Sequence, residues 1–198
     1  GFLAGALAGL MTRSKTVGMV AGVEIPPVRR FRQGYDAGVK YVCPPCQVLG
    51  VYLDSFVDPA RGKTAALSQI DEGADVIFGG GGTTGSGAIL GATQAGAWAI
   101  GVDQDEFMTT FHNGAAPGAR KLLSSAMKRV DSAVYGAIKT ALDGTFTGGT
   151  QVFDASNDGI GLAPFHAAEQ AVPEPVRDRL QEIMAGLKAG TVKTNVVR

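Results

Sequence analysis

A glycine-rich turn directly follows one short apolar segment, and a carboxylate residue directly follows the next apolar segment. Residues 74–78 run into four glycines at positions 79–82 and then Thr83, whereas residues 97–102 end in Asp103. Glycine permits positive φ and lets a ligand approach the main chain, and a helix N-terminus offers unpaired N–H groups. An ionised carboxylate can accept two hydroxyl hydrogen bonds. These residue types indicate a small-molecule site at the carboxyl ends of parallel strands.

The composition is that of a globular protein. The 198 residues are 45% apolar and 18% charged, with a formal net charge of zero. This balance lacks the basic footprint of a nucleic-acid-binding protein. The 29 glycines are about twice the usual ~7%, and their placement between apolar segments predicts turns and close packing. No apolar run approaches the ~20 residues of a membrane span.

Strands and helices alternate through the first half of the chain. We expect strands at 16–21, 47–53, 74–78 and 97–102, and helices at 28–39, after Asp58 and at 88–95. We expect Asp58 to be the N-cap of the helix that begins at Pro59, and Gly73 to follow its end. Near-continuous apolar strands are typical of a sheet covered by helices on both faces. The pattern predicts an α/β fold with a doubly wound parallel sheet.

The alternation fades after Asp103. There we expect a polar loop at 105–119, a helix at 126–142, a hairpin-like stretch at 150–162, a helix at 173–187 and a strand at 191–196. The apolar stripe of the first helix would contain Met127, Val130, Val134, Ile138 and Leu142. The amino-terminal segment 1–11 is apolar but lacks the basic leader and cleavage site of a signal peptide. Its Phe2, Leu3, Leu7 and Leu10 indicate a helix inside a fold.

Several short motifs, taken in order, resemble the basic membrane protein family of nucleoside-binding lipoproteins from bacterial ABC importers. The motifs are Phe2-Leu3-Ala4-Gly5, Val17-Gly18-Met19-Val20-Ala21-Gly22, Ile25-Pro26, Arg29-Arg30-Phe31 with Gly34, Ser55-Phe56-Val57-Asp58, Gly62-Lys63, Gly73-Ala74-Asp75-Val76-Ile77-Phe78 with the glycine run, Trp98-Ala99-Ile100-Gly101-Val102-Asp103, and Ser124-Ser125 with Lys128. The resemblance covers nearly the whole chain.

The resemblance implies the type I periplasmic-binding fold, in which two lobes hold the ligand between them. A long upstream segment that forms most of the first lobe in the family is absent from this chain. We therefore expect residues 14–125 to form a Rossmann-like ligand-binding lobe. Residues 1–13 would be a remnant of the first lobe, and 126–198 its returning elements. Lobe closure would occur about crossovers near 12–15, 125–128 and Gly148.

The resemblance also implies roles for individual residues. Phe78 would stack on the base, Gly82 and Thr83 would meet the ligand through the loop backbone, and Asp103 would accept ribose hydroxyls. Lys128, which we place in the first turn of its helix, would be a polar contact from the crossover. Each residue has a structural alternative, such as core packing for Phe78 and turn capping for Asp103. Phe56 lies in a strand-end loop and is a further candidate to line the cleft.

The sequence departs from the family in two places, and both bear on which ligand is bound. The loop reads Gly81-Gly82-Thr83-Thr84-Gly85 where Ala-Gly-Gly-Thr-Gly is usual, and Asp105-Glu106 stands where Asp-Gln is usual.

The expected protein is therefore a non-enzymatic receptor, with a purine nucleoside as ligand and an ABC permease as partner. It would be extracytoplasmic, periplasmic or anchored to the cell membrane as a lipoprotein, touching the membrane only through a lipid anchor outside this chain. We expect no catalytic residues, no cofactor and no nucleic-acid partner. His112 and His166 are isolated from other metal-ligand residue types, so no metal site is predicted.

Three alternatives stay open. Gly80-x-Gly82-x-x-Gly85 with Asp103 satisfies the dinucleotide fingerprint of a NAD-dependent oxidoreductase, although it follows the third strand instead of opening the fold. Cys43-Pro44-Pro45-Cys46 could be a redox motif, although the following residues read as a strand, which favours a structural turn or a local disulfide. The third alternative is the ligand-sensing domain of a regulator.

Overall fold

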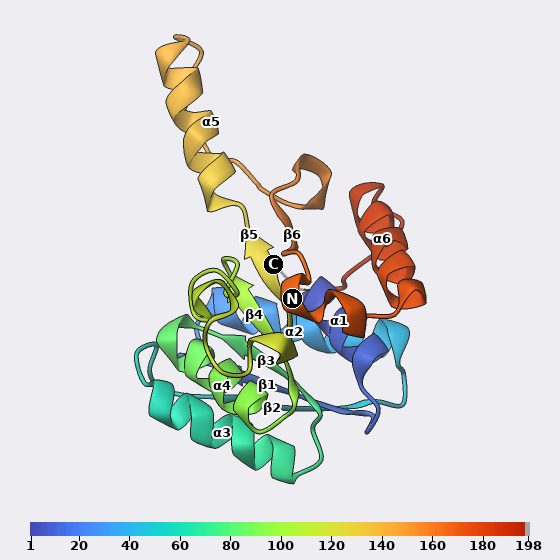
Figure 1. Ribbon diagram of the computed structural model, residues 1–198. Coiled ribbons are helices and arrows are strands. Elements are labelled where there is room, and N and C mark those ends of the chain that lie inside the picture. Colours follow the sequence, from blue (N-terminus) through green and yellow to red (C-terminus); the bar gives the residue numbers. More distant parts are fainter. Residues whose placement is uncertain (197–198) are drawn as a thin grey trace.

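The computed structural model describes residues 1–196 and contains one six-stranded sheet (Figure 1). The strands lie in the order β2-β1-β3-β4-β5-β6, and every neighbouring pair is parallel except β5 and β6. The strands are β1 (Thr16–Ala21), β2 (Gln47–Tyr52), β3 (Val76–Gly80), β4 (Trp98–Asp103), β5 (Leu122–Lys128) and β6 (Ile160–Leu162). The α-helices are α1 (Phe2–Met11), α2 (Pro26–Val42), α3 (Pro59–Asp71), α4 (Gly82–Gln94), α5 (Val130–Leu142) and α6 (Glu174–Lys188).

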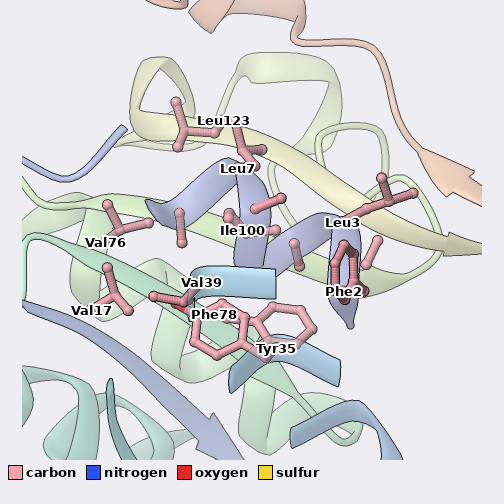
Figure 2. Packing of buried hydrophobic residues seen from close by; sticks show 14 of the residues in the cluster. Phe2, Leu3, Leu7, Val17, Tyr35, Val39, Val76, Phe78, Ile100 and Leu123 are labelled. Atoms are coloured by element: carbon pink, nitrogen blue, oxygen red, sulfur yellow. The ribbon is translucent and has the colours of Figure 1, made fainter. Parts of the chain in front are cut away.

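Helices cover both faces of the sheet, as expected for a doubly wound fold. Helices α1 and α2 pack together on one face, and α3 and α4 pack together on the other. Side chains of a strand alternate between its two faces, so Val76 and Phe78 contact the first helix layer whereas Ile77 contacts the second. Figure 2 shows the first layer, with Tyr35 of α2 beside Phe78. This confirms the predicted α/β class.

Glycine lets the helices of each layer approach closely. A Cβ on Gly5 of α1 would collide with the carbonyl oxygen of Tyr35, and one on Gly38 of α2 would collide with that of Phe2. Gly62 of α3 stands in the same relation to the carbonyl oxygen of Thr84 in α4. The high glycine content therefore serves close packing, as the sequence predicted.

The predicted N-cap and carboxyl-terminal end of α3 are confirmed. The Asp58 carboxylate accepts the backbone N–H of Arg61 at 3.0 Å, and Pro59 takes the first helical position. Gly73 follows the helix end with a φ of 101°. Cys43 and Cys46 form a disulfide in the turn between α2 and β2. Since no helix begins at this motif, the geometry is that of a structural turn and not of a redox site.

Three predictions for the carboxyl-terminal third are wrong. Residues 122–128 form β5, so the helix expected at 126–142 begins only at Val130, and Met127 lies in the strand. The expected hairpin at 150–162 is a 3₁₀ turn at Ala155–Asn157 followed by β6, which pairs with β5. Residues 191–196 form no strand. The partners of β5 and β6 are remote in sequence, so local patterning could not select them, and residues 191–196 pair with no strand of the sheet.

Helix α5 projects away from the sheet (Figure 1). Of the predicted apolar stripe, Val130, Val134, Ile138 and Leu142 lie on this helix and are exposed, and the neighbouring Tyr135 is exposed as well. None of the described residues of α5 is buried. Helix α6 packs against α1 through Leu180 and Ile183 instead.

Candidate ligand-binding site

A pocket of about 270 Å³ opens at the carboxyl ends of β1, β3 and β4. The chain leaves β1 for the edge strand β2 and then returns to β3 on the other side of β1. Loops that depart in opposite directions leave a crevice at such a switch point, which is where open α/β sheets bind ligands. The lining residues are Met19, Ile25, Pro27, Val28, Phe31, Phe56, Gly80, Gly81, Gly82, Val102, Asp103 and Lys128. The glycine turn and Asp103 therefore share one pocket.

The backbone conformation and the close neighbours of the glycine turn both favour glycine. Gly81 and Gly82 have φ values of 95° and 64°, which L side chains rarely adopt. A Cβ on Gly81 would lie 2.6 Å from the backbone nitrogen of Gly22, and one on Gly82 would meet the carbonyl oxygen of Phe56. Helix α4 begins at Gly82. Its first N–H groups have no partner within the helix. That of Thr84 donates to the carbonyl oxygen of Phe56 at 3.2 Å, and those of Gly82 and Thr83 can serve a polar ligand.

The two threonines after the turn have different positions. Thr84 is buried, where its hydroxyl donates to the carbonyl oxygen of Ser55 at 2.8 Å and accepts the N–H of Asp58 at 2.9 Å. This fixes the β2–α3 loop that carries Phe56. Thr83 is exposed and faces the neighbouring polar pocket described below.

Asp103 and Lys128 form an ion pair at the mouth of the pocket. The Lys128 Nζ lies 2.8 Å from Asp103 Oδ1, and also 5.0 Å from the centre of the Phe31 ring. Lys128 ends β5 and does not lie in the first turn of a helix as predicted. Asp103 and Met127 are paired in the β4–β5 ladder, which brings the two strand ends together.

Phe78, which we expected to stack on a ligand, does not line this pocket. Phe78 is fully buried, and its ring stacks on that of Tyr35 at a centroid distance of 5.1 Å (Figure 2). The aromatic rings that line the pocket belong to Phe31 of α2 and Phe56 of the β2–α3 loop. In the sequence, Phe31 stood out only as part of the Arg29-Arg30-Phe31 motif within the helix expected at 28–39. Its signal was its position early in the helix that follows β1, where the carboxyl end of the strand meets the site.

A second pocket of about 580 Å³ adjoins the first. The two share Gly82, Val102, Asp103 and Lys128, but the second pocket is lined largely by polar residues. Those residues include Thr83, Ser86, Gln104, Glu106 and Asp131. The site thus joins an apolar half with two aromatic rings to a polar half, and the Asp103–Lys128 pair stands between them.

Glu106 is the buried acid beside this site. Its carboxylate accepts hydrogen bonds from Ser86 Oγ at 2.9 Å, Thr110 Oγ1 at 2.5 Å and the Val102 N–H at 3.2 Å. Burial raises the pKa of the Glu106 carboxyl, and the nearby Asp103 charge adds to this, while the three donors lower it. Sequence reasoning noted Glu106 only as a departure from the family pattern.

Comparison with known proteins decides the family. The family model described as "ABC transporter substrate-binding protein PnrA-like" matches residues 1–193. The chain belongs to this family. It is 32% identical over 203 residues to a CD4+ T-cell-stimulating antigen of Listeria monocytogenes, covering 97% of this chain and 56% of that protein. It is 31% identical over 179 residues to the ABC transporter nucleoside-binding protein BmpA of Lactococcus lactis, covering 85% and 51%.

Solved structures support the fold of this PnrA-like chain. A solute-binding protein of an ABC transporter system from Aeropyrum pernix has a TM-score of 0.78 at 23% identity, covering 97% of this chain and 64% of that one. A transcriptional activator of the comK gene from Bacillus halodurans has a TM-score of 0.81 at 20% identity, covering 96% and 62%. At such identities the likeness shows the fold alone. The chain spans about half the length of the curated relatives it matches.

Proposed function

We propose that this PnrA-like chain is the ligand-binding lobe of a solute-binding protein that delivers a purine nucleoside to an ABC importer. The observation that carries the proposal is the shared pocket, in which Asp103 and the glycine turn meet the rings of Phe31 and Phe56. An aromatic face suits a flat base, and a carboxylate suits a pair of hydroxyls. A nucleoside carries both groups. The name of the Lactococcus relative supports this ligand class.

In this proposal Phe31 and Phe56 contact the base, and Asp103 accepts the ribose hydroxyls. Gly82 and Thr83 meet the ligand at the start of α4, and Lys128 adds a polar contact. Both members of the Asp103–Lys128 pair are about half exposed, with exposed side-chain fractions of 49% and 42%. An exposed pair of this kind contributes only about 0–1 kcal/mol. Ligand hydroxyls can therefore share or replace the lysine at low cost.

The domain division is also a proposal. Residues 14–125 contain β1 to β4 and most of β5. All residues that line the apolar pocket belong to this range except Lys128. The segments expected to belong to the first lobe are 1–13 and 126–198. Of their elements, α1, β6 and α6 pack with the six-stranded sheet and its core, whereas α5 projects from it, and we assign α5 to the first lobe. The exposed apolar stripe of α5 supports this assignment, because a helix with such a stripe ordinarily packs against another element. Lys128 then lies where the chain crosses between lobes, so a ligand bound to it would bias lobe closure.

The proposed protein binds and releases its ligand without chemistry, and its partner is a membrane permease. We place it outside the cytoplasm as a lipoprotein. A relative from Pyrococcus abyssi is named a lipoprotein, and the Cys43–Cys46 disulfide is typical of an oxidising compartment. Among residues 1–196, no helix has both the length and the apolar character needed to cross a bilayer.

The test is isothermal titration calorimetry of the full-length protein against adenosine, guanosine, inosine, cytidine and free ribose. Saturable binding of purine nucleosides, with weaker binding of ribose, supports the proposal. NADH serves as a probe of the dinucleotide alternative, through fluorescence enhancement. Tight NADH binding without nucleoside binding would overturn the receptor assignment.

A further inference from the structure

The backbone at Asp103 forms an unusual turn. Asp103 has a φ of 68°, and the Gln104 N–H donates to the carbonyl oxygen of Val102 at 2.8 Å. A three-residue turn with a positive central φ is rare and strained. Such a conformation persists only where the surrounding structure holds it. This turn determines where the Asp103 carboxylate lies in the pocket.

The Glu106 side chain binds the first residue of this turn, Val102. Its Oε1 accepts the N–H of Val102, so Val102 is bound through its carbonyl to Gln104 and through its N–H to Glu106. The carboxylate contact spans only four residues, and it closes the loop that contains Asp103. Asp103, the strained residue, therefore lies between two hydrogen-bonded positions, Val102 and Gln104.

The rest of Glu106 is bound to the elements that carry the other site residues. Ser86, which donates to Oε2 of Glu106, lies in α4, in the turn of helix that follows Gly82. The Glu106 N–H donates to Ser125 Oγ at 3.1 Å, and Ser125 lies in β5, which ends at Lys128. Glu106 thus connects α4, β4 and β5, the three elements whose ends supply Gly82, Asp103 and Lys128.

The environment of Glu106 is specific to a carboxylate or an amide. The residue is 3% exposed, and no ion pair found within residues 1–196 includes it. The other acids that line the polar pocket are Asp103 of β4 and Asp131 of α5. Lys128 pairs with Asp103, and Arg129 pairs with Asp131. Gly101 leaves room for the side chain, because a Cβ there would lie 3.0 Å from Cβ and Cγ of Glu106. The Glu106 carboxylate accepts hydrogen bonds from the Val102 N–H and from the hydroxyls of Ser86 and Thr110.

We propose that Glu106 is a positioning residue of the ligand site, which holds the Val102–Gln104 turn so that the Asp103 carboxylate faces the pocket. This inference rests on the proposed function for its ligand, but the contact with Val102 can be measured without one. Because Glu106 also borders the polar pocket, the competing possibility is a direct contact with ligand, and the two predict different energetics.

The experiment is a double-mutant cycle in the full-length protein, with guanosine and adenosine as probes. Glu106→Ala is expected to weaken binding about tenfold, as loss of a strained local conformation would. Glu106→Gln is expected to stay within about threefold of wild type, since its amide oxygen can accept the Val102 N–H. In the Asp103→Ala background, Glu106→Ala is expected to add no further loss, because residues that act through one another are not additive. Glu182→Ala, an exposed acid on α6, is the matched control.

Hydrogen exchange without ligand gives the second readout. The Val102 amide is expected to exchange at least about tenfold faster in Glu106→Ala than in Glu106→Gln, with Ile100 unchanged as the internal reference. If Glu106→Ala does not fold, Gly101→Ala offers a second route, because its methyl group would displace the Glu106 side chain. It is expected to reproduce both the affinity loss and the faster exchange.

The outcomes are separable. Additive losses in the cycle would overturn positioning in favour of direct contact, and unchanged Val102 exchange in Glu106→Ala would overturn the contact itself. Loss of affinity in Glu106→Gln equal to that in Glu106→Ala would also contradict the inference. A wild-type protein that binds no nucleoside would overturn the proposed function, while the exchange measurement would still decide whether Glu106 holds the turn.

Discussion

The Lys128 ammonium lies 2.8 Å from the Asp103 carboxylate at the boundary between an apolar and a polar pocket. The pair joins the ends of β4 and β5. The lysine therefore pairs with the same carboxylate that the proposed function gives to the ribose. A ligand that binds Asp103 changes a contact at the point where the chain leaves the sheet for α5.

Removal of the Asp103 carboxylate should weaken nucleoside binding. Asp103→Ala is expected to raise the Kd about tenfold or more, ~1.4 kcal/mol, because two charge-assisted hydrogen bonds are lost. Calorimetry with guanosine measures the effect. Asp143→Ala, an exposed acid at the end of α5, should leave the affinity unchanged. Equal affinities for wild type and Asp103→Ala would count against the assignment of this residue.

The two phenylalanines near the site should separate affinity from stability. Phe31→Leu is expected to weaken nucleoside binding by about 1–3 kcal/mol, the range for loss of a base-stacking ring. Phe78→Leu removes a buried ring that stacks on Tyr35 and is expected to lower the free energy of unfolding by about 1 kcal/mol. Its affinity should change little in the folded protein. Urea unfolding and calorimetry on both variants decide the matter, and the reverse pattern would restore the stacking role to Phe78.

The buried acid should make stability depend on pH. Because burial raises the folded-state pKa of Glu106 above its ordinary value of 4.5, the folded protein binds more protons than the unfolded chain between the two values. The contribution of Glu106 to the free energy of unfolding therefore falls as the pH rises through that window, and it stays level above it. Glu106→Gln carries no titrating charge, so it should be more stable than wild type at pH 7 and lose this advantage near pH 4.

Urea unfolding of wild type and Glu106→Gln from pH 4 to pH 8 tests this sign. A wild type that gains stability relative to the variant as the pH rises would show that the hydrogen bonds to Glu106 outweigh its burial.

The polar pocket should favour neutral nucleosides over their 5′-monophosphates. Asp103, Glu106 and Asp131 line it with Lys128 as the single cation among its lining residues, so a phosphate there meets a net negative field. Like charges a few ångströms apart cost about 1 kcal/mol even in water. Guanosine monophosphate is expected to bind about fivefold or more weakly than guanosine, and Asp131→Asn should narrow the gap. Equal affinities in low salt would contradict this picture of the pocket.

Sequence alone determined the features that arise from local physics. Apolar strands separated by helices predicted the parallel sheet, because each strand is buried on both faces. The Asp58 cap, the glycine turn and the acid at Asp103 were readable since each requires a particular residue type at one position. The carboxyl ends of parallel strands meet at one edge, so the shared pocket of Gly82 and Asp103 also followed.

Only the tertiary structure decided which side chains reach that pocket. Phe78 alternates into the layer beneath α1 and α2, whereas Phe31 is turned to the site by the packing of α2, and a single sequence does not reveal this choice. Residues 122–128 are a strand because β4 and β6 pair with them, and pairing across such separations cannot be read locally. Glu106 is informative for the same reason: its partners come from α4, β4 and β5, and only folding brings them around one carboxylate.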